Sequence, residues 1–265
     1  MEKRESKAII CCAKHKQFTK QRLKNTNIHY NILLEVRAVR GLQNKTDYWR
    51  QNMQYYIPTK VYQEIDAVKA HAEELAGYGS CALIVTGKYS ARANGALADV
   101  EAALDAYGKK HVQYDGIEEN PSVETVMKAT EFGKRNGVDF VIAIGGGSPM
   151  DAAKAIAIML ANPEKNADYL YESVACTKAL PVVTIPTTCG TGSEVTGVAV
   201  LTVHAKRTKA SLPHRVFPVL ALADPKYLKT ASKKVIGQTA IDALGHLIES
   251  YLNRAATDYS RMFVD

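Results

Sequence analysis

The 265-residue sequence is long enough for one large domain or two smaller ones, each with a buried core. Hydrophobic residues make up 46% of it, but no uninterrupted apolar run approaches the roughly 18 residues that a membrane span needs, so we expect none. The net charge of +7 would favour a nucleic-acid partner only if the basic residues belonged to the folded part of the chain.

The excess positive charge is confined to the first fifth of the chain. Residues 1–52 hold 12 Lys and Arg against 4 Asp and Glu, and the remainder is nearly neutral. This segment shows no sustained hydrophobic period, so we expect a basic extension outside the fold, translated from a misplaced start codon. The alternative is a basic arm that binds nucleic acid or anionic lipid. For the body of the protein we expect neither a nucleic-acid nor a membrane partner.

The five cysteines form no pair with metal-ligand or disulfide-framework spacing. An odd number of cysteines without such a framework is typical of a reducing compartment. The N-terminus also lacks the continuous apolar core of a secretion signal. We therefore expect a cytoplasmic protein.

Strand and helix patterns alternate from residue 81 onward. Apolar runs at 81–87, 110–116, 139–144 and 180–185 predict strands, and helical periods at 90–108, 122–137 and 148–163 predict the helices between them. This order predicts an α/β fold with a mostly parallel, Rossmann-like sheet covered by helices, which we place at residues 53–233. Further strands are predicted within 195–203 and 207–224. From Pro225 onward the sequence predicts only helix, so residues 234–265 are expected to start an all-helical domain.

A glycine triplet joins the strand at 139–144 to the next helix. Gly145, Gly146 and Gly147 permit positive φ and close approach of a ligand to the backbone. Ser148 is expected to cap the helix, and Asp151 completes a box-like S-x-x-D arrangement. The resulting helix N-terminus favours an anion such as a phosphate. The alternative is a tight turn with a good cap and no ligand.

A second loop, rich in hydroxyl groups, follows the strand at 180–185. In "PTTCGTGSEVT", hydroxyl groups come from Thr187, Thr188, Thr191 and Ser193, and glycines at 190 and 192 allow close approach of the backbone. Cys189 has no neighbouring general base, so a nucleophile is not expected there. Because both loops follow parallel strands, they should meet at one edge of the sheet, and a dinucleotide cofactor would explain the pair.

Asp242 and His246 lie four positions apart in "IDALGHLIESY", a segment with a helical pattern. On a helix, residues at this spacing share a face, so the two side chains could bind one metal ion. The alternative is an ion pair on the surface of a capped helix.

Five motifs in this order resemble the iron-containing (group III) alcohol dehydrogenases. They are "IVTG", "ENPS", "AIGGGSPMDAAKAIA", "IPTTCGTGSEVT" and "IDALGHLIESY", and the resemblance runs from about residue 53 to the end. It implies an architecture like that of dehydroquinate synthase, in which an α/β domain precedes a helical one. It also implies hydride transfer between NAD(P) and a small primary alcohol or aldehyde.

The resemblance assigns roles by position. It implies that Gly145, Gly146, Gly147 and Ser148 wrap the cofactor pyrophosphate, that Thr187, Thr188 and Thr191 lie beside the ribose and nicotinamide, and that Asn120 and Lys209 also lie near the cofactor. Many NAD-using members carry an aspartate where this chain has Gly87. An acidic side chain there would repel a 2′-phosphate, and Lys88 adds positive charge, so we expect NADP(H) to be favoured over NAD(H).

For Asp242 and His246 the resemblance implies binding of Fe²⁺, with Zn²⁺ as the alternative. In the family, two later histidines complete this site, but no histidine follows His246 in this sequence. We therefore expect that a C-terminal part is missing, that this chain alone is inactive, and that the full-length enzyme is a homo-oligomer. Two alternatives stay open: a lyase resembling dehydroquinate synthase, and a fragment that binds nucleotide without catalysis.

Overall fold

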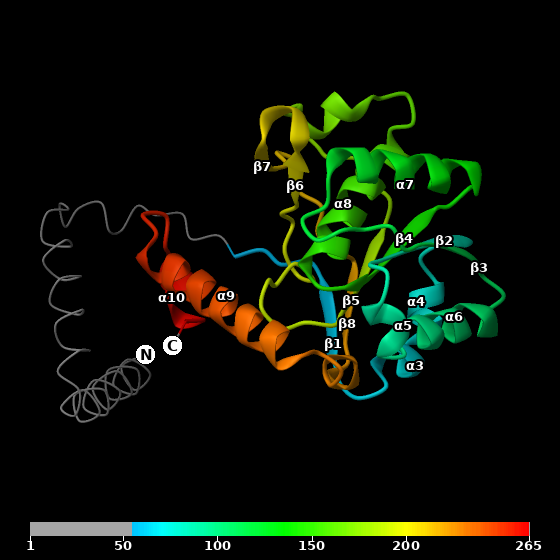
Figure 1. Ribbon diagram of the computed structural model, residues 1–265, viewed down its shortest axis with the longest axis horizontal. Helices are drawn as coiled ribbons and strands as arrows, with labels where there is room; N and C mark the ends of the chain where they lie inside the picture. The colour runs from blue at the N-terminus through cyan, green and yellow to red at the C-terminus, as the bar shows by residue number, and fades with distance from the viewer. Residues whose placement is uncertain (1–54, 265) are drawn as a thin grey trace, which may run out of the picture. The chain divides into compact units, whose positions relative to one another are not determined.

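The computed structural model describes residues 55–264, so the basic extension expected at 1–52 lies outside the described residues. A parallel sheet of six strands forms the centre, in the order β1-β8-β5-β4-β2-β3 (Figure 1). Its strands are β1 (Lys60–Gln63), β2 (Cys81–Thr86), β3 (Lys110–Tyr114), β4 (Phe140–Gly145), β5 (Val182–Pro186) and β8 (Leu220–Ala223). A separate antiparallel hairpin joins β6 (Val200–Val203) to β7 (Thr208–Ser211).

The α-helices of the described part are α3 (Ala67–Ala70), α4 (Ala72–Ala76), α5 (Ser90–Ala93), α6 (Ala96–Ala106), α7 (Val123–Arg135), α8 (Gly147–Ala161), α9 (Lys233–Leu252) and α10 (Asp258–Met262). Short 3-10 helices are η2 (Ala167–Tyr171), η3 (His204–Lys206) and η4 (Pro225–Leu228). Between residues 55 and 264, none of the helices combines the length and the hydropathy needed to cross a membrane.

The sheet has two covered faces, and the side chains of each strand alternate between them. From β2, Leu83 and Val85 belong to the core under α7 and α8. Ala82 and Ile84 belong to the other core, formed with α3, α4, α5 and α6. Figure 1 shows these four helices on one side of the sheet and α7 and α8 on the other. Burial on both faces explains why β2 and β4 are continuous apolar runs rather than alternating ones.

The strands predicted from residue 81 to residue 185 are confirmed as β2 to β5, and the prediction of a mostly parallel sheet is also confirmed. The helix predicted at 90–108 is instead two helices, α5 and α6. The break falls at Gly95, whose φ of 84° is left-handed, and the Asn94 side chain accepts the Ala96 N–H at 3.0 Å. Edge strand β1 was not recognised because its four residues are mostly exposed and show no apolar run.

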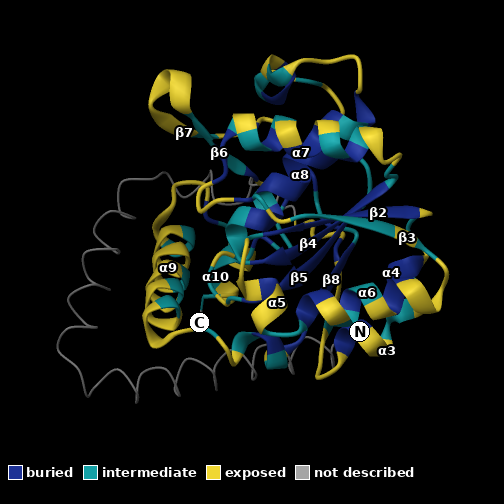
Figure 2. Cartoon of the chain, turned by 45° about the vertical axis from the view of Figure 1, so that its right-hand side comes forward, coloured by how far each residue is buried: buried dark blue, intermediate teal, exposed yellow. Residues whose placement is uncertain are grey.

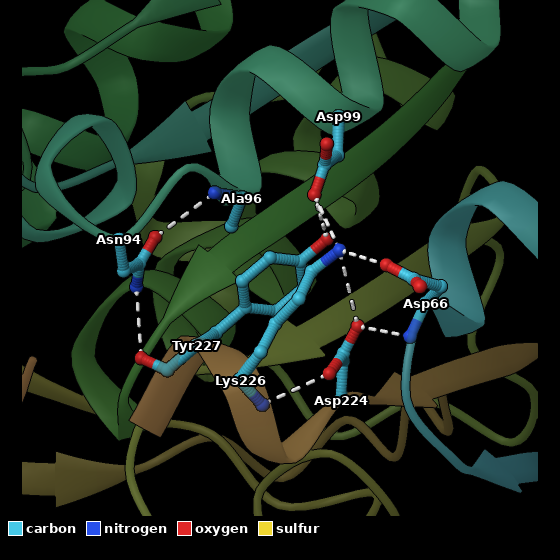
Figure 3. Close-up of polar contacts among 7 residues, drawn as sticks. All are labelled: Asp66, Asn94, Ala96, Asp99, Asp224, Lys226 and Tyr227. Carbon is cyan, nitrogen blue, oxygen red and sulfur yellow. Dashed lines mark hydrogen bonds and ion pairs between the residues drawn. The ribbon is translucent and has the colours of Figure 1, made fainter. Parts of the chain in front are cut away.

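A polar cluster joins the start of α3 and the start of η4, which follows β8, to α6 on one side of the sheet (Figure 3). The Lys226 ammonium lies 2.5 Å from Asp66, 2.9 Å from Asp99 and 3.5 Å from Asp224, which is fully buried. The Tyr227 hydroxyl donates to Asp99 at 2.7 Å. Burial, and then the bond to Asp99, raise the pKa of Tyr227 above its ordinary value. One cation therefore compensates carboxylates from three separate elements.

Replacing Tyr227 by Phe should lower the free energy of unfolding by about 1–2 kcal/mol, because the ring stays buried while one hydrogen bond to a carboxylate is lost. Urea denaturation followed by circular dichroism measures this difference. Tyr89→Phe is the matched control, since Tyr89 is 79% exposed and should cost nothing measurable. Equal stability of the Tyr227 variant and the wild type would mean that this bond does not stabilise the fold.

Candidate functional site

The glycine triplet lies at the carboxyl end of β4, and its conformation requires glycine at the first position. Gly145 has a φ of 152°, and a Cβ there would lie 2.6 Å from Cγ of Pro149. Gly146 is the N-cap of α8 and makes no side-chain cap. The first turn of α8 therefore presents backbone N–H groups without a capping side chain, as an anion site requires.

The capping arrangement predicted from Ser148 and Asp151 is wrong. Helix α8 begins at Gly147, so Ser148 lies inside its first turn, where its hydroxyl accepts the Asn120 N–H at 3.1 Å. The Asp151 carboxylate accepts from the Ser193 hydroxyl at 2.6 Å and from the Val200 N–H at 3.0 Å. Tertiary partners outcompete the local box, because both side chains meet other segments of the chain.

The threonine loop, residues 187–193, packs directly against the glycine triplet. A Cβ on Gly146 would lie 2.9 Å from Oγ1 of Thr188, and a Cβ on Gly147 would lie 2.9 Å from Cγ2 of Thr191. The Thr187 N–H donates to the Gly145 carbonyl at 2.9 Å. The two loops singled out in the sequence thus meet at one sheet edge, and the missing side chains of the glycines allow this approach.

Asn120 and Lys209 are 89 residues apart in the chain but are joined in space. The Lys209 ammonium donates to the Asn120 side-chain oxygen at 2.7 Å, and the Thr202 hydroxyl donates to the Asn120 carbonyl at 2.8 Å. Asn120 has a left-handed φ of 57°, which Asn tolerates better than most residues. Because its N–H also reaches Ser148, Asn120 connects the β6–β7 hairpin to the first turn of α8.

Gly87 follows β2, whose last residue pairs with Ile144 of β4, so it lies beside the glycine triplet at the same sheet edge. A Cβ on Gly87 would meet only the Ile117 carbonyl, at 3.5 Å, which is an ordinary van der Waals contact. Lys88 is exposed. Sequence reasoning missed Arg92 of α5, whose guanidinium donates to Gln113 near this edge. No sequence pattern marked Arg92, because its position depends on how α5 packs.

Asp242 and His246 share one face of α9, with 4.0 Å between a carboxylate oxygen and Nδ1 of the imidazole. Both side chains are about half exposed. His246 Nδ1 also lies 3.4 Å from the Gly190 carbonyl, so the pair adjoins the threonine loop. Within residues 55–264 no third His, Cys, Asp or Glu joins them to form a metal-binding group. The pair supplies one O and one N donor, as a transition-metal site needs, but only part of a full ligand set.

An apolar groove of about 490 Å³ separates the threonine loop from α9. Thr187, Thr188 and Cys189 line one side of it, and Val235, Thr239 and Leu244 are among the α9 residues on the other. Helix α9 contributes no fully buried residue (Figure 2). At the tightest contact a Cβ on Gly190 would lie 2.5 Å from the Thr239 carbonyl, so glycine is needed where loop and helix touch.

Sequence reasoning also missed Lys154, a fully buried lysine in α8. Its ammonium donates to the Ser193 hydroxyl and to the Val198 carbonyl, each at 2.8 Å. Burial lowers the pKa of Lys154 from 10.5 to about 8, against the opposing charges of Asp151 and Glu194. The signal in the sequence was a single lysine inside the otherwise apolar run "AAKAIAIMLA".

The parallel sheet, with its loops gathered at one edge, defines an α/β protein of the Rossmann-like class. The family model described as iron-containing alcohol dehydrogenase matches residues 58–225. The chain belongs to the iron-containing alcohol dehydrogenase family.

Relatives of known activity and solved structures agree with this assignment. The chain is 39% identical over 180 residues to the long-chain primary alcohol dehydrogenase AdhA of Thermoanaerobacter ethanolicus, covering 67% of this chain and 45% of that protein. It is 38% identical over 179 residues to lactaldehyde reductase of Escherichia coli, covering 66% and 46%. An iron-containing alcohol dehydrogenase structure from Thermotoga maritima matches with a TM-score of 0.76 at 39% identity, covering 80% of this chain and 58% of that one. The chain spans about half the length of the curated relatives it matches.

Proposed function

We propose that this chain carries the cofactor-binding part of a metal-dependent alcohol dehydrogenase or aldehyde reductase that transfers a hydride between NAD(P) and a small primary alcohol or aldehyde. The observation that carries the proposal is the convergence of the glycine triplet, the threonine loop and the Asn120–Lys209 pair at one sheet edge, next to Asp242 and His246. The family membership supports the same reaction.

In this proposal the dinucleotide lies across the carboxyl ends of β2, β4 and β5. The N–H groups of the first turn of α8, with Gly146 and Gly147 leaving room, hold the pyrophosphate. Thr187, Thr188 and Thr191 contact the ribose and nicotinamide, and Asn120 with Lys209 closes the site from the hairpin side. When bound, the nicotinamide supplies the hydride acceptor or donor, and the protein orients it.

Asp242 and His246 are proposed to hold Fe²⁺, with Zn²⁺ as the alternative, together with donors beyond these two. When bound, such an ion supplies Lewis acidity at the substrate oxygen. Helix α9 keeps the carboxylate and the imidazole on one face, and the contact between His246 and the Gly190 carbonyl holds that face beside the threonine loop. The apolar groove between loop and helix suits the alkyl chain of a small alcohol.

The same proposal divides the chain into domains at residues 53–233 and 234–265. It also includes a cytoplasmic location and a homo-oligomeric full-length enzyme. A lyase resembling dehydroquinate synthase is not favoured, because the matching relatives are named as alcohol dehydrogenases and reductases. Those relatives include butanol dehydrogenases described as NADH-dependent and as NADPH-dependent, so the cofactor preference depends on this chain's own residues.

Gly146→Val tests the phosphate site. The new Cβ would meet Oγ1 of Thr188 at 2.9 Å, and its methyl groups would displace the threonine loop from the first turn of α8. The dissociation constant for NADPH, measured by calorimetry, should rise at least about tenfold. Gly237→Ala is the control, since a Cβ there meets nothing within 4 Å, and it should bind normally. Unchanged affinity in the Gly146 variant would mean that the cofactor binds elsewhere.

Gly87→Asp tests the preference for NADP(H). The Cβ of an aspartate is tolerated beside the Ile117 carbonyl, and its carboxylate should repel a 2′-phosphate and accept from a ribose 2′-hydroxyl. The ratio of NADPH to NADH affinity should fall by about tenfold or more. Gly87→Asn separates charge from size, because it keeps the shape without the repulsion and should change the ratio less. A ratio that stays constant in both variants would rule out Gly87 as the determinant.

The iron content of the purified chain tests whether Asp242 and His246 alone can hold a metal ion. Two donors leave an ion mostly hydrated, because affinity depends on assembling several donors in one place. The purified 265-residue chain, incubated with Fe²⁺ without oxygen and then desalted, should hold much less than one iron per chain and should not oxidise alcohols. Elemental analysis and an anaerobic assay measure both properties, with Asp242→Ala as the metal-free reference. One tightly bound iron per chain would show that the described donors suffice.

A further inference from the structure

Lys154 is the one fully buried lysine of residues 55–264, and it makes specific contacts rather than pointing to solvent. Its ammonium donates to the Ser193 hydroxyl and the Val198 carbonyl at 2.8 Å each, and lies 3.9 Å from Asp151. The Ser193 hydroxyl in turn donates to Asp151 at 2.6 Å. These three side chains form a closed cluster, which we call the Lys154 lock.

The Lys154 lock joins helix α8 to the end of the threonine loop. Lys154 and Asp151 belong to the first two turns of α8, while Ser193 is the last residue of the loop. The second oxygen of Asp151 accepts the Val200 N–H at 3.0 Å, so the start of β6 is held as well. The segment that leaves the loop is therefore fixed to the same helix whose first turn forms the proposed phosphate site.

The stability of the fold does not explain why a lysine occupies this buried position. Burial lowers the pKa of Lys154 to about 8, and the charges of Asp151 and Glu194 only partly oppose this. Between pH 8 and 10.5 the folded state therefore binds fewer protons than the unfolded state, so this group's contribution to stability improves as pH rises. At neutral pH the charged ammonium opposes folding, and a buried ion pair is often replaceable by apolar residues. The presence of Lys154 is better explained by the position that it gives to its hydrogen-bond partners.

Through Ser193, Lys154 affects the position of the threonine loop. The Ser193 N–H donates to Oγ1 of Thr191 at 3.3 Å, and Thr191 is the residue that packs against Gly147. A shift of Ser193 would therefore move Thr191 relative to the first turn of α8. The separation of these two segments sets the width of the proposed dinucleotide site.

We propose that Lys154 is a positioning residue: with Asp151 it holds Ser193 so that the threonine loop stands at the distance from α8 that the nicotinamide half of the cofactor requires. This inference rests on the proposed function. Lys154 touches neither the cofactor nor the substrate, so its effect is on the geometry of the loop. In the proposed binding mode the adenosine half of the cofactor lies at the end of β2, which takes part in none of the hydrogen bonds of the Lys154 lock.

Two ligands separate a positioning role from general support of the fold. NADPH spans both halves of the site, whereas adenosine 2′,5′-bisphosphate lacks the nicotinamide half and needs only the end of β2 and the first turn of α8. Lys154→Met alone leaves the Asp151 carboxylate buried beside no cation and can unfold the chain. The test therefore uses the double variant Asp151→Asn/Lys154→Met, which removes both charges and keeps the side-chain sizes close.

In the double variant of the 265-residue chain, NADPH affinity measured by calorimetry should fall about tenfold, as for the loss of one hydrogen bond to the cofactor. Affinity for adenosine 2′,5′-bisphosphate should change by less than about twofold. The thermal midpoint should stay within about 5 °C of the wild type. Hydrogen exchange of the peptide covering residues 187–195 should accelerate, while that of β4 should not. Ile158→Val, a buried change near the far end of α8, is the control and should leave both affinities unchanged.

NADPH affinity equal to wild type in the double variant would overturn the proposal. Equal losses for both ligands would overturn it too, because the cluster would then support the whole site rather than the loop. Failure of the wild-type chain to bind either ligand would refute the proposed function instead. In that case hydrogen exchange still tests whether the lock positions the loop. Unchanged exchange at residues 187–195 in the double variant would overturn the proposed role of Lys154.

Discussion

The site depends on the close packing of the threonine loop against the glycine triplet. At Gly146 and Gly147 a Cβ would lie 2.9 Å from Thr188 and Thr191, closer than side chains normally approach. The two segments can therefore touch only because these glycines have no side chains. This contact places the end of β5 over the first turn of α8, and every other element of the proposed site is arranged around it.

From this contact, connections extend in two directions. On one side Asn120, held in a left-handed conformation, links Ser148 of α8 to Lys209 of the hairpin. On the other side Gly190 allows the loop to touch α9, which carries Asp242 and His246. The loop thus contacts both the proposed cofactor site and the helix that carries the proposed metal ligands.

Two lysine clusters beside the sheet differ in their roles: one stabilises the fold, and the other is proposed to position a loop. The cluster of Lys226 with Asp66, Asp99 and Asp224 compensates a buried carboxylate and ties the start of α3 to α6. The Lys154 lock, on the opposite face of the sheet, places a cation where burial lowers its pKa. The surroundings of Lys226 favour its charged form, whereas those of Lys154 disfavour it. The Lys226 cluster therefore stabilises the fold, and the Lys154 lock is proposed to position the threonine loop.

Elements with a local sequence signal could be predicted without the structure. Apolar runs at β2 and β4, the glycine triplet and the i, i+4 pair Asp242–His246 carry their period or spacing in consecutive residues, so they could be predicted. The hydrogen-bond partner of each polar side chain, in contrast, follows from how distant segments pack. Ser148 bonds to Asn120 and Asp151 to Ser193, instead of forming the local capping box. Edge strand β1 was not predicted because its mostly exposed residues form no apolar run. The lysine in the apolar run of α8 is visible in the sequence, but its partners Ser193 and Val198 are not, because they lie about 40 residues away and no local pattern encodes those contacts.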